Sequence, residues 1–318
     1  MIQQIAILLG SFLLLALAGK LLIDALSRIG VCLKLKEFVL AFFIMGVGAT
    51  IPNLIIGVVS AMHKIPELSF GDVMGANIFD ISIVVGLAAL VSRGGLSSNS
   101  RTVQGSAIFV MIIALLPLFL VLDGIISRTD GIVLLTAFAI YATWLFSKKD
   151  RFTKVYEDCP QKINTKEIVR DIVMVCGGLA LLFLGGQGVV RSATFLYETF
   201  DLPLGLIGIF VVAIGTCTPE TFFSLHAARK GQDWMILGNL MGNVAITSTF
   251  VLGIVSLITP IKIMDFSPFA IARLFLIIAV LSFFLLVKTG QKVSRKEGIA
   301  LIGVYVAFLI AEILFEYN

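Results

Sequence analysis

Two acidic residues lie in stretches of the sequence that are largely apolar. Asp80 ends the segment that begins at Gly71, and Glu220 directly follows Pro219. An ionisable side chain deep in a membrane span is costly, and it is a candidate for function by default. Carboxylate oxygens are hard ligands that suit cations such as Ca²⁺ and Na⁺. The sequence therefore predicts a cation-binding site built on Asp80 and Glu220.

Further oxygen donors lie in two short segments that contain proline. One segment reads Gly46-Val-Gly-Ala-Thr-Ile-Pro-Asn53, and the other reads Ala213-Ile-Gly-Thr-Cys-Thr-Pro-Glu220. A proline within a helix frees the carbonyl four residues earlier, and a free carbonyl at membrane depth is costly unless it is buried or binds a cation. The same segments supply hydroxyl and amide oxygens, from Thr50, Asn53, Thr216 and Thr218.

Two other segments place polar residues on one face of a helix. The first carries Asp72 and Asp80, eight residues apart, and the second carries Asn239, Asn243 and Thr247 at steps of four. Residues four apart share a helix face. Each segment also holds a Gly-x-x-x-Gly pair, which lets another helix approach closely. For Asp72 two interpretations stay open: a site residue, or a carboxylate that caps a helix start at the membrane surface.

The rest of the chain has the composition of a membrane protein. Of its 318 residues, 58% are hydrophobic and 14% are charged, and the mean hydropathy is +1.05, whereas a soluble domain has about 25% charged residues. This composition excludes a cytosolic enzyme and a disordered protein. A net charge of only +4 without a basic stripe argues against nucleic-acid binding. We find no enzyme or ATP-binding motif, so we expect neither catalytic residues nor a cofactor.

We predict an all-α polytopic membrane protein with ten transmembrane helices. A span needs about 20 mostly apolar residues, and the apolar segments are 3–26, 38–62, 68–92, 105–122, 130–147, 168–190, 204–228, 234–258, 269–287 and 298–315. The first segment is long enough to span, so we expect it to be a helix of the protein and not a cleaved signal.

Positive residues alternate between the loops. Eighteen lysines and arginines follow the odd-numbered segments and four follow the even-numbered ones. Because cytoplasmic loops carry the excess of positive charge, we expect both termini outside the cytoplasm, in a plasma or inner membrane. The cysteines fit no zinc or disulfide pattern, and we interpret most of them as small buried or loop residues: Cys32, Cys159, Cys176 and Cys217.

The sequence overlays itself when it is shifted by 167 residues. This register aligns Gly48 with Gly215, Pro52 with Pro219, Gly71 with Gly238, Gly75 with Gly242 and Gly86 with Gly253. Each half then holds five segments, and because five is odd the second half enters the membrane from the opposite side. We predict two inverted five-helix repeats, 1–147 and 168–318, joined by a basic cytoplasmic linker at 148–167. Secondary transporters use such repeats and bind their substrates near the bilayer midplane between them.

These motifs resemble those of the sodium/calcium exchanger family, within the wider cation/calcium antiporter superfamily. The family pattern has Gly-Thr-Ser-x-Pro-Glu on helices 2 and 7 and Gly-Asn-x-x-Gly-Ser-Asn on helices 3 and 8. Residues 215–220 and 238–242 match it well, and residues 71–77 match it with changes. The chain departs from the pattern at Asn53, where the family has its other glutamate. Asp80 stands where some relatives have asparagine, and Thr247 where some have aspartate.

The resemblance implies a cation site in which Asp80 restores the charge that is lost at Asn53. Two carboxylates balance one Ca²⁺, two Na⁺ or two protons. The implied ligands combine carboxylates, neutral side-chain oxygens and backbone carbonyls, and they are Glu220, Asp80, Asp72, Asn53, Thr50, Thr216, Asn243, Thr247, Gly46 and Ala213.

The implied function is secondary active antiport of Ca²⁺ against Na⁺ by alternating access, with the first and sixth helices sliding past a partly fixed site. Two alternatives stay open: an H⁺-coupled exchanger of Ca²⁺ or another cation, and a cation channel or non-transporting binding protein. The expected partners are the transported cations and the lipid bilayer. The sequence indicates no particular oligomeric state.

Overall fold

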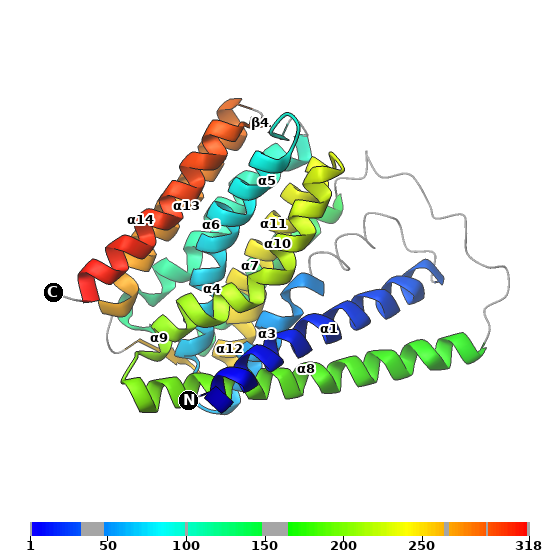
Figure 1. Ribbon diagram of the computed structural model, residues 1–318, viewed down its shortest axis with the longest axis vertical. Coiled ribbons are helices and arrows are strands. Elements are labelled where there is room, and N and C mark those ends of the chain that lie inside the picture. Colours follow the sequence, from blue (N-terminus) through cyan, green and yellow to red (C-terminus); the bar gives the residue numbers. More distant parts are fainter. Residues whose placement is uncertain are drawn as a thin grey trace.

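The structure is a computed structural model that describes residues 2–32, 48–98, 101–147, 165–263, 267–290 and 292–316. The chain is almost entirely helical (Figure 1). The first half contains α1 (Ile2–Cys32), α3 (Gly48–Met62), α4 (Glu67–Phe79), η2 (Asp80–Val84), α5 (Val85–Val91), α6 (Arg101–Leu120), η3 (Val121–Asp123) and α7 (Arg128–Ser147). The second half contains α8 (Thr165–Phe200), α9 (Leu204–Leu206), η5 (Ile207–Val212), α10 (Ala213–Arg229), α11 (Asp233–Ala245), η6 (Ile246–Val251), α12 (Leu252–Ile258), α13 (Ser267–Gly290) and α14 (Arg295–Glu316).

Within the described residues, eight helical stretches have the length and apolar composition of a membrane span. They begin or end within a few residues of eight of the predicted segments. A ninth, Thr50–Met62, is apolar but shorter, because residues 33–47 lie outside the described part of the chain. Helix α7 covers the predicted segment 130–147, but it is not among the eight stretches found within the described residues. The protein is therefore a helical integral membrane protein.

Helix α8 is ten residues longer at its C-terminal end than the predicted segment 168–190. The sequence from Arg191 to Phe200 contains neither glycine nor proline, so nothing in it interrupts the helical hydrogen bonds. The helix ends only at Asp201, whose φ of 54° is left-handed, and Pro203 follows. The predicted segment stopped before the charged Arg191, whereas the helix continues through it, and the whole stretch Arg170–Phe200 has the length and composition of a membrane span.

Three helices contain a wider π turn in the middle of an otherwise α-helical run. The turns are η2 between α4 and α5, η5 between α9 and α10, and η6 between α11 and α12. A π turn is rare, and it is frequently found at functional sites. Asp80 is the first residue of η2 and Thr247 is the second residue of η6, so the polar residues of the motif segments lie where the helices are widened.

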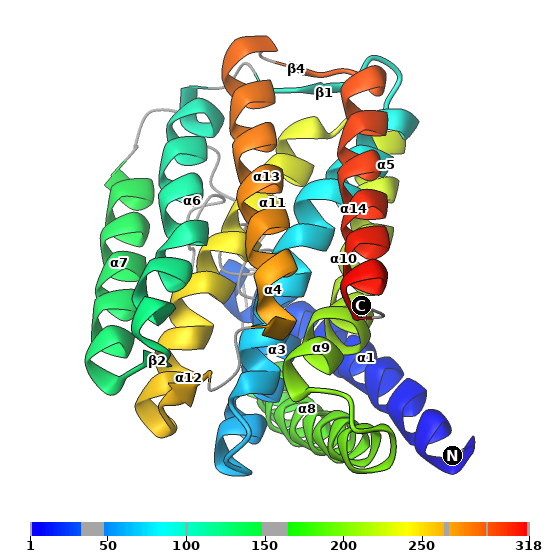
Figure 2. The ribbon, with the colours of Figure 1, turned by 90° about the vertical axis from the view of Figure 1, so that its left-hand side faces the viewer.

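Two of these composite helices form the centre of the molecule. In Glu67–Val91 and in Met235–Ile258, 78% of the most apolar 18-residue stretch is buried inside the protein. In Arg170–Phe200 the buried share is 28%. Helices α1 and α8 pack along one another and cross the other helices at a steep angle (Figures 1 and 2). Their exposed leucines, such as Leu9, Leu13 and Leu184, form an outer surface suited to lipid.

Glycines allow the close approach of α4 to the segment formed by α9 and η5. A Cβ at Gly71 would overlap the Gly205 carbonyl, and one at Gly75 would overlap the Ile209 carbonyl. The predicted role of this Gly-x-x-x-Gly pair in helix approach is confirmed. For Gly238, in the matching pair, no atom of the described residues lies within 4 Å of an added Cβ, so the same role stays a prediction there.

Two short antiparallel ribbons tie the halves together. Strand β1 (Leu96–Ser97) pairs with β4 (Lys292–Val293), and β2 (Ile125–Ile126) pairs with β3 (Ile261–Lys262). Each ribbon joins one strand from each half of the chain. The two ribbons lie at opposite ends of the helices (Figure 2).

Candidate functional site

Polar side chains from α3, α4, η2, α10, α11 and η6 meet inside the protein in three buried groups. We call the first the carboxylate centre, defined by Asp80, Glu220, Asn243 and Cys217. We call the second the Asp72 centre, defined by Asp72, Asn53 and Thr216. We call the third the amide cluster, defined by Asn77, Thr247 and Ser248. All ten of these side chains are buried.

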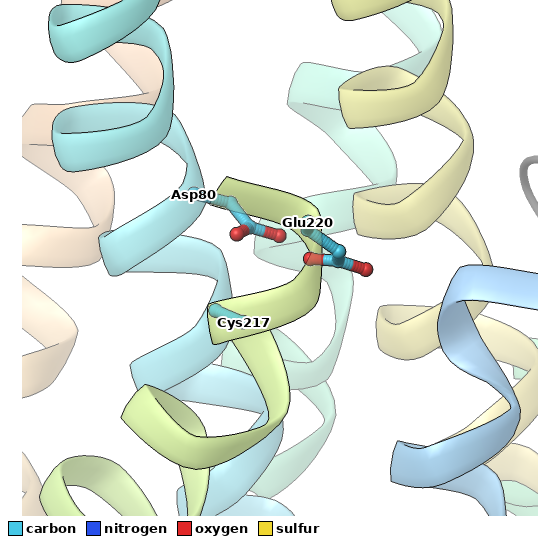
Figure 3. A group of neighbouring side chains, drawn as sticks. All are labelled: Asp80, Cys217 and Glu220. Atoms are coloured by element: carbon cyan, nitrogen blue, oxygen red, sulfur yellow. The ribbon is translucent and has the colours of Figure 1, made fainter. Parts of the chain in front are cut away.

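The carboxylate centre brings the two predicted key acids together. Asp80 begins η2 and Glu220 lies in α10, and their carboxylates point toward one another (Figure 3). Ligand atoms of Asp80, Glu220 and Cys217 all lie within 4.8 Å of one another. Only 2% of Asp80 and 5% of Glu220 is exposed. The spacing of the ligand atoms is compatible with one cation bound between them.

Asn243 of α11 bridges the two carboxylates. Its Nδ2 donates to Asp80 Oδ2 at 2.6 Å and to Glu220 Oε2 at 3.0 Å. Carboxylates that are ionised can only accept, and a side-chain amide has two N–H donors on one nitrogen. The amide nitrogen must therefore face the acids, and the amide oxygen must point elsewhere.

Three oxygens of the carboxylate centre have no hydrogen-bond partner among the described residues. They are Asp80 Oδ1, Glu220 Oε1 and Asn243 Oδ1. Among the described residues, no lysine or arginine forms a salt bridge with either acid. Buried polar atoms are nearly always satisfied, and each exception calls for an explanation. Unpaired acceptors beside two uncompensated acids are what a hard cation requires.

The Asp72 centre is organised differently. Asn53 Nδ2 donates to Asp72 Oδ2 at 3.1 Å and to Thr216 Oγ1 at 3.2 Å. Thr216 Oγ1 lies 3.2 Å from Asp72 Oδ1 and 3.1 Å from the Ala213 carbonyl, and its one proton serves one of the two at a time. Asp72 lies within α4, more than a turn after its start at Glu67, and is fully buried. The interpretation of Asp72 as a surface cap is therefore wrong.

The amide cluster engages the hydroxyl of the predicted ligand Thr247 in hydrogen bonds. Thr247 Oγ1 donates to Asn77 Oδ1 at 3.1 Å, or to the Asn243 carbonyl at 2.9 Å. Asn77 Nδ2 donates to Ser248 Oγ at 2.8 Å. These bonds join η6 to α4, so the cluster fixes the two central helices next to the carboxylate centre.

The remaining predicted residues lie in different surroundings. Thr50 is buried on α3, one turn before Asn53. The Ala213 carbonyl is at hydrogen-bond distance from Thr216. Gly46 lies outside the described residues. Thr218, which the sequence offered as a further oxygen donor, is exposed and donates to the Ile214 carbonyl on its own helix.

Cys217 is the residue of the carboxylate centre that the sequence reasoning missed. It was interpreted with the other cysteines as a small residue without a role, yet it lies against both acids. The signal was its position three residues before Glu220, because residues three apart share a helix face. Asn77 and Ser248 were also missed, since the predicted polar stripe on each helix did not include them.

Comparison with known proteins places this arrangement in a family. The family model described as sodium/calcium exchanger protein matches residues 3–147 and 171–314. The chain is 24% identical to the inner membrane protein YrbG of Escherichia coli, over 97% of this chain and 96% of YrbG. It is 23% identical to the sodium/calcium exchanger MaX1 of Methanosarcina acetivorans, over 91% and 92% of the two chains.

The fold is also similar to that of a solved structure. The sodium-calcium exchanger NCX_Mj superimposes with a TM-score of 0.67 over 97% of this chain and 98% of that chain, at 24% sequence identity. The overlap covers nearly the whole of both chains, so the helical arrangement described above is that of NCX_Mj.

Proposed function

Because this chain belongs to the sodium/calcium exchanger protein family, we propose that it exchanges Ca²⁺ for Na⁺ across the membrane, with the carboxylate centre as its cation site. One observation carries this assignment. Within the described part of the chain, the buried acids Asp80 and Glu220 each keep an oxygen without a hydrogen-bond partner, and a third such oxygen belongs to Asn243. An uncompensated buried charge costs several kcal/mol, and a bound cation removes that cost.

The charge of the centre fits the exchanged ions. Two carboxylates balance one Ca²⁺ or two Na⁺, so the site keeps its net charge when one load replaces the other. When a cation enters, the Asn243 amide has to turn or move aside, because its N–H groups otherwise occupy the space between the acids. Turning would bring its unpaired oxygen to the ion.

We propose that the other predicted ligands lie around the carboxylate centre, along the path by which the ion reaches it. Asn53, Thr50 and Thr216 belong to the side of the site formed by α3 and α10, together with the backbone carbonyls of Gly46 and Ala213. Thr247 belongs to the side formed by η6. Asp72 joins this set as the residue that holds Asn53 and Thr216 in place, since both of its oxygens lie at hydrogen-bond distance from them.

We also propose that the chain has ten spans in two inverted repeats, 1–147 and 168–318, joined by the linker 148–167. The shift of 167 residues carries η2 (80–84) onto 247–251, which is η6 without its first residue. It carries β2 (125–126) onto β4 (292–293). The shift thus carries a strand of one ribbon onto a strand of the other, and the two ribbons lie at opposite ends of the helices (Figure 2), which supports opposite orientations of the halves. In this proposal both termini lie outside the cytoplasm.

Alternating access in this proposal comes from α1 and α8. Small residues line their contact: a Cβ at Gly188 would overlap Ser11 Oγ, and one at Gly185 would meet Leu15 at 2.9 Å. This close contact lets α1 and α8 move as one unit. Toward the central helices, an added Cβ at Gly186 of α8 would lie 2.8 Å from Ile55 of α3, so few side chains interlock there. In this proposal the pair slides over the central helices and opens the site to either side of the membrane.

Transport into proteoliposomes tests the function. We expect Ca²⁺ uptake when an outward Na⁺ gradient is imposed, and loss of that uptake in Glu220→Gln. Glu198→Gln, which removes an exposed glutamate at the end of α8, is the matched control and should transport normally. Uptake driven only by a pH gradient would replace Na⁺ by H⁺ as the coupling ion. Flux that needs no counter-ion would indicate a channel, and binding without flux would indicate a non-transporting protein.

A further inference from the structure

Cys217 places sulfur inside a centre that otherwise offers oxygen and amide groups. The side chain is 1% exposed, and its Sγ lies within 4.8 Å of carboxylate oxygens of Asp80 and Glu220. Its hydrogen bond to the Ala76 carbonyl is long, at 3.9 Å. The shift of 167 residues aligns Cys217 with Thr50, so the first half of the chain has a hydroxyl where the second half has a thiol.

The geometry leaves room for one ion that contacts all three residues. Three points that are at most 4.8 Å apart lie within about 2.8 Å of a common point, since 4.8 Å divided by the square root of three is 2.8 Å. Metal–sulfur bonds are about 2.3 Å for zinc, and bonds from oxygen to larger cations reach about 2.6 Å. Small side-chain movements bring all three atoms into range.

A second observation shows that this is more than a buried cysteine. Asp80 Oδ1 and Glu220 Oε1 are buried without hydrogen-bond partners, so the two acids beside the thiol are available as ligands. Soft thiolate ligands favour metals such as Zn²⁺ over Ca²⁺ and Mg²⁺, which prefer oxygen. A site with two carboxylates and one thiol therefore accepts calcium and holds a thiophilic ion more tightly.

We propose that the carboxylate centre also binds thiophilic divalent cations, of the class of Cd²⁺ and Zn²⁺, with the Cys217 sulfur as a third ligand beside Asp80 and Glu220. The Sγ–H bond breaks, the proton leaves with the water that the ion sheds, and a sulfur–metal bond forms with no change of oxidation state. The ion occupies the same space as Ca²⁺ and competes with it. This proposal rests on the proposed function in one respect, because the ion must be able to enter the buried site.

Cadmium is the probe, because its bond to a thiolate absorbs ultraviolet light. In purified protein whose other cysteines are replaced by serine (Cys32, Cys159 and Cys176), Cd²⁺ should produce a charge-transfer band. The band should be absent when Cys217→Ser is added to the same background. The difference spectrum of the otherwise unchanged protein against its Cys217→Ser variant repeats the measurement without the triple replacement. Absence of a Cys217-dependent band in both pairs would overturn the proposal.

Transport gives an independent measurement. Cd²⁺ should inhibit Ca²⁺ uptake, and Cys217→Ser should raise the half-inhibitory concentration at least about tenfold, the lower end of what a lost supporting partner costs a metal site. The half-inhibitory concentration of Cd²⁺ is compared with the half-saturating concentration of Ca²⁺ in the same protein, so that a change in Ca²⁺ affinity is not counted as loss of the sulfur ligand. Equal inhibition of the two proteins would reject the sulfur ligand while coupled Ca²⁺ transport stands. A Cys217-dependent band in a protein without coupled transport would support the ligand and reject the proposed exchange.

Discussion

The carboxylate centre and the Asp72 centre are built from the same chemical groups and differ in how completely those groups are paired. In each, an asparagine amide donates two hydrogen bonds to buried partners. At Asp72 both carboxylate oxygens have donors in range. At Asp80 and Glu220 one oxygen of each acid has no partner. The carboxylate oxygens of the Asp72 centre are paired with hydrogen-bond donors. The carboxylate centre needs a further positive charge to pair its oxygens.

This difference in pairing suggests that the two centres have different roles. The helical run of α4 and η2 contributes Asp72 and Asp80, and α10 contributes to both centres, with α3 added at Asp72 and α11 added at Asp80. A satisfied buried network rigidifies its surroundings, so the Asp72 centre is suited to hold the helices in register. The unsatisfied centre is suited to bind and release ions. The experiments below ask whether the two centres separate in this way.

Removing either acid of the carboxylate centre should have the largest effect. Asp80→Asn and Glu220→Gln keep the shape of the side chain and delete a charge, so one carboxylate remains to balance a divalent ion. We expect Na⁺-driven Ca²⁺ uptake into proteoliposomes to fall at least about 100-fold, beyond the loss that an outer-shell change usually causes. Normal uptake in either variant would remove that residue from the site.

Asn243→Ala should have the next largest effect. It deletes both the amide that bridges the acids and the oxygen that we expect to reach the cation. We expect the apparent affinity for Ca²⁺ to fall about 10- to 100-fold, measured as the concentration for half-maximal uptake. Asn239→Ala is the matched control, because it makes the same change one turn earlier on α11. Equal effects of the two substitutions would show that Asn243 acts only through helix packing.

Asn53→Glu would add a second carboxylate to the Asp72 centre and remove the amide that donates hydrogen bonds there. The new carboxylate would lie beside Asp72, and two like charges in a buried site repel unless a cation separates them. We expect an altered preference between Na⁺ and Ca²⁺ and a lower melting temperature in the presence of a chelator. The double variant with Asp72→Asn should recover the melting temperature. No recovery would mean that Asn53 and Asp72 are not coupled as their hydrogen bond indicates.

The sequence predicted the principal acids and the helices that carry them, but not the division into two centres. Asp80 and Glu220 could be identified because charged residues stand out in apolar segments. The pairing of Asn53 with Asp72 depends on which faces of α3 and α4 meet. Part of that geometry comes from the fit of Gly71 against the Gly205 carbonyl, and spacing along one helix carries no information about it.

Other differences have equally local causes. The end of α8 was placed ten residues early because Arg191 and Glu198 interrupt the apolar pattern, although the helix continues through both. Cys217 was overlooked because cysteine is often a small buried residue, and only the position of Asp80 opposite it gives the thiol a possible role. The π turns that widen the helices at Asp80 and Thr247 had no sequence signal that we used.

Asp72→Asn should have the smallest effect on transport and gives the sharpest comparison with Asp80→Asn. Both substitutions replace one buried aspartate of the same helical run by its amide, eight residues apart. A ligand that binds only the folded protein stabilises it by about 2.7 kcal/mol at a concentration 100 times its Kd. We therefore expect saturating Ca²⁺ to raise the melting temperature of the unchanged protein and of Asp72→Asn, and to leave that of Asp80→Asn unmoved. A calcium-induced shift that survives in Asp80→Asn and disappears in Asp72→Asn would reverse the assignment of the two centres, because the charge that the cation needs would then lie at Asp72.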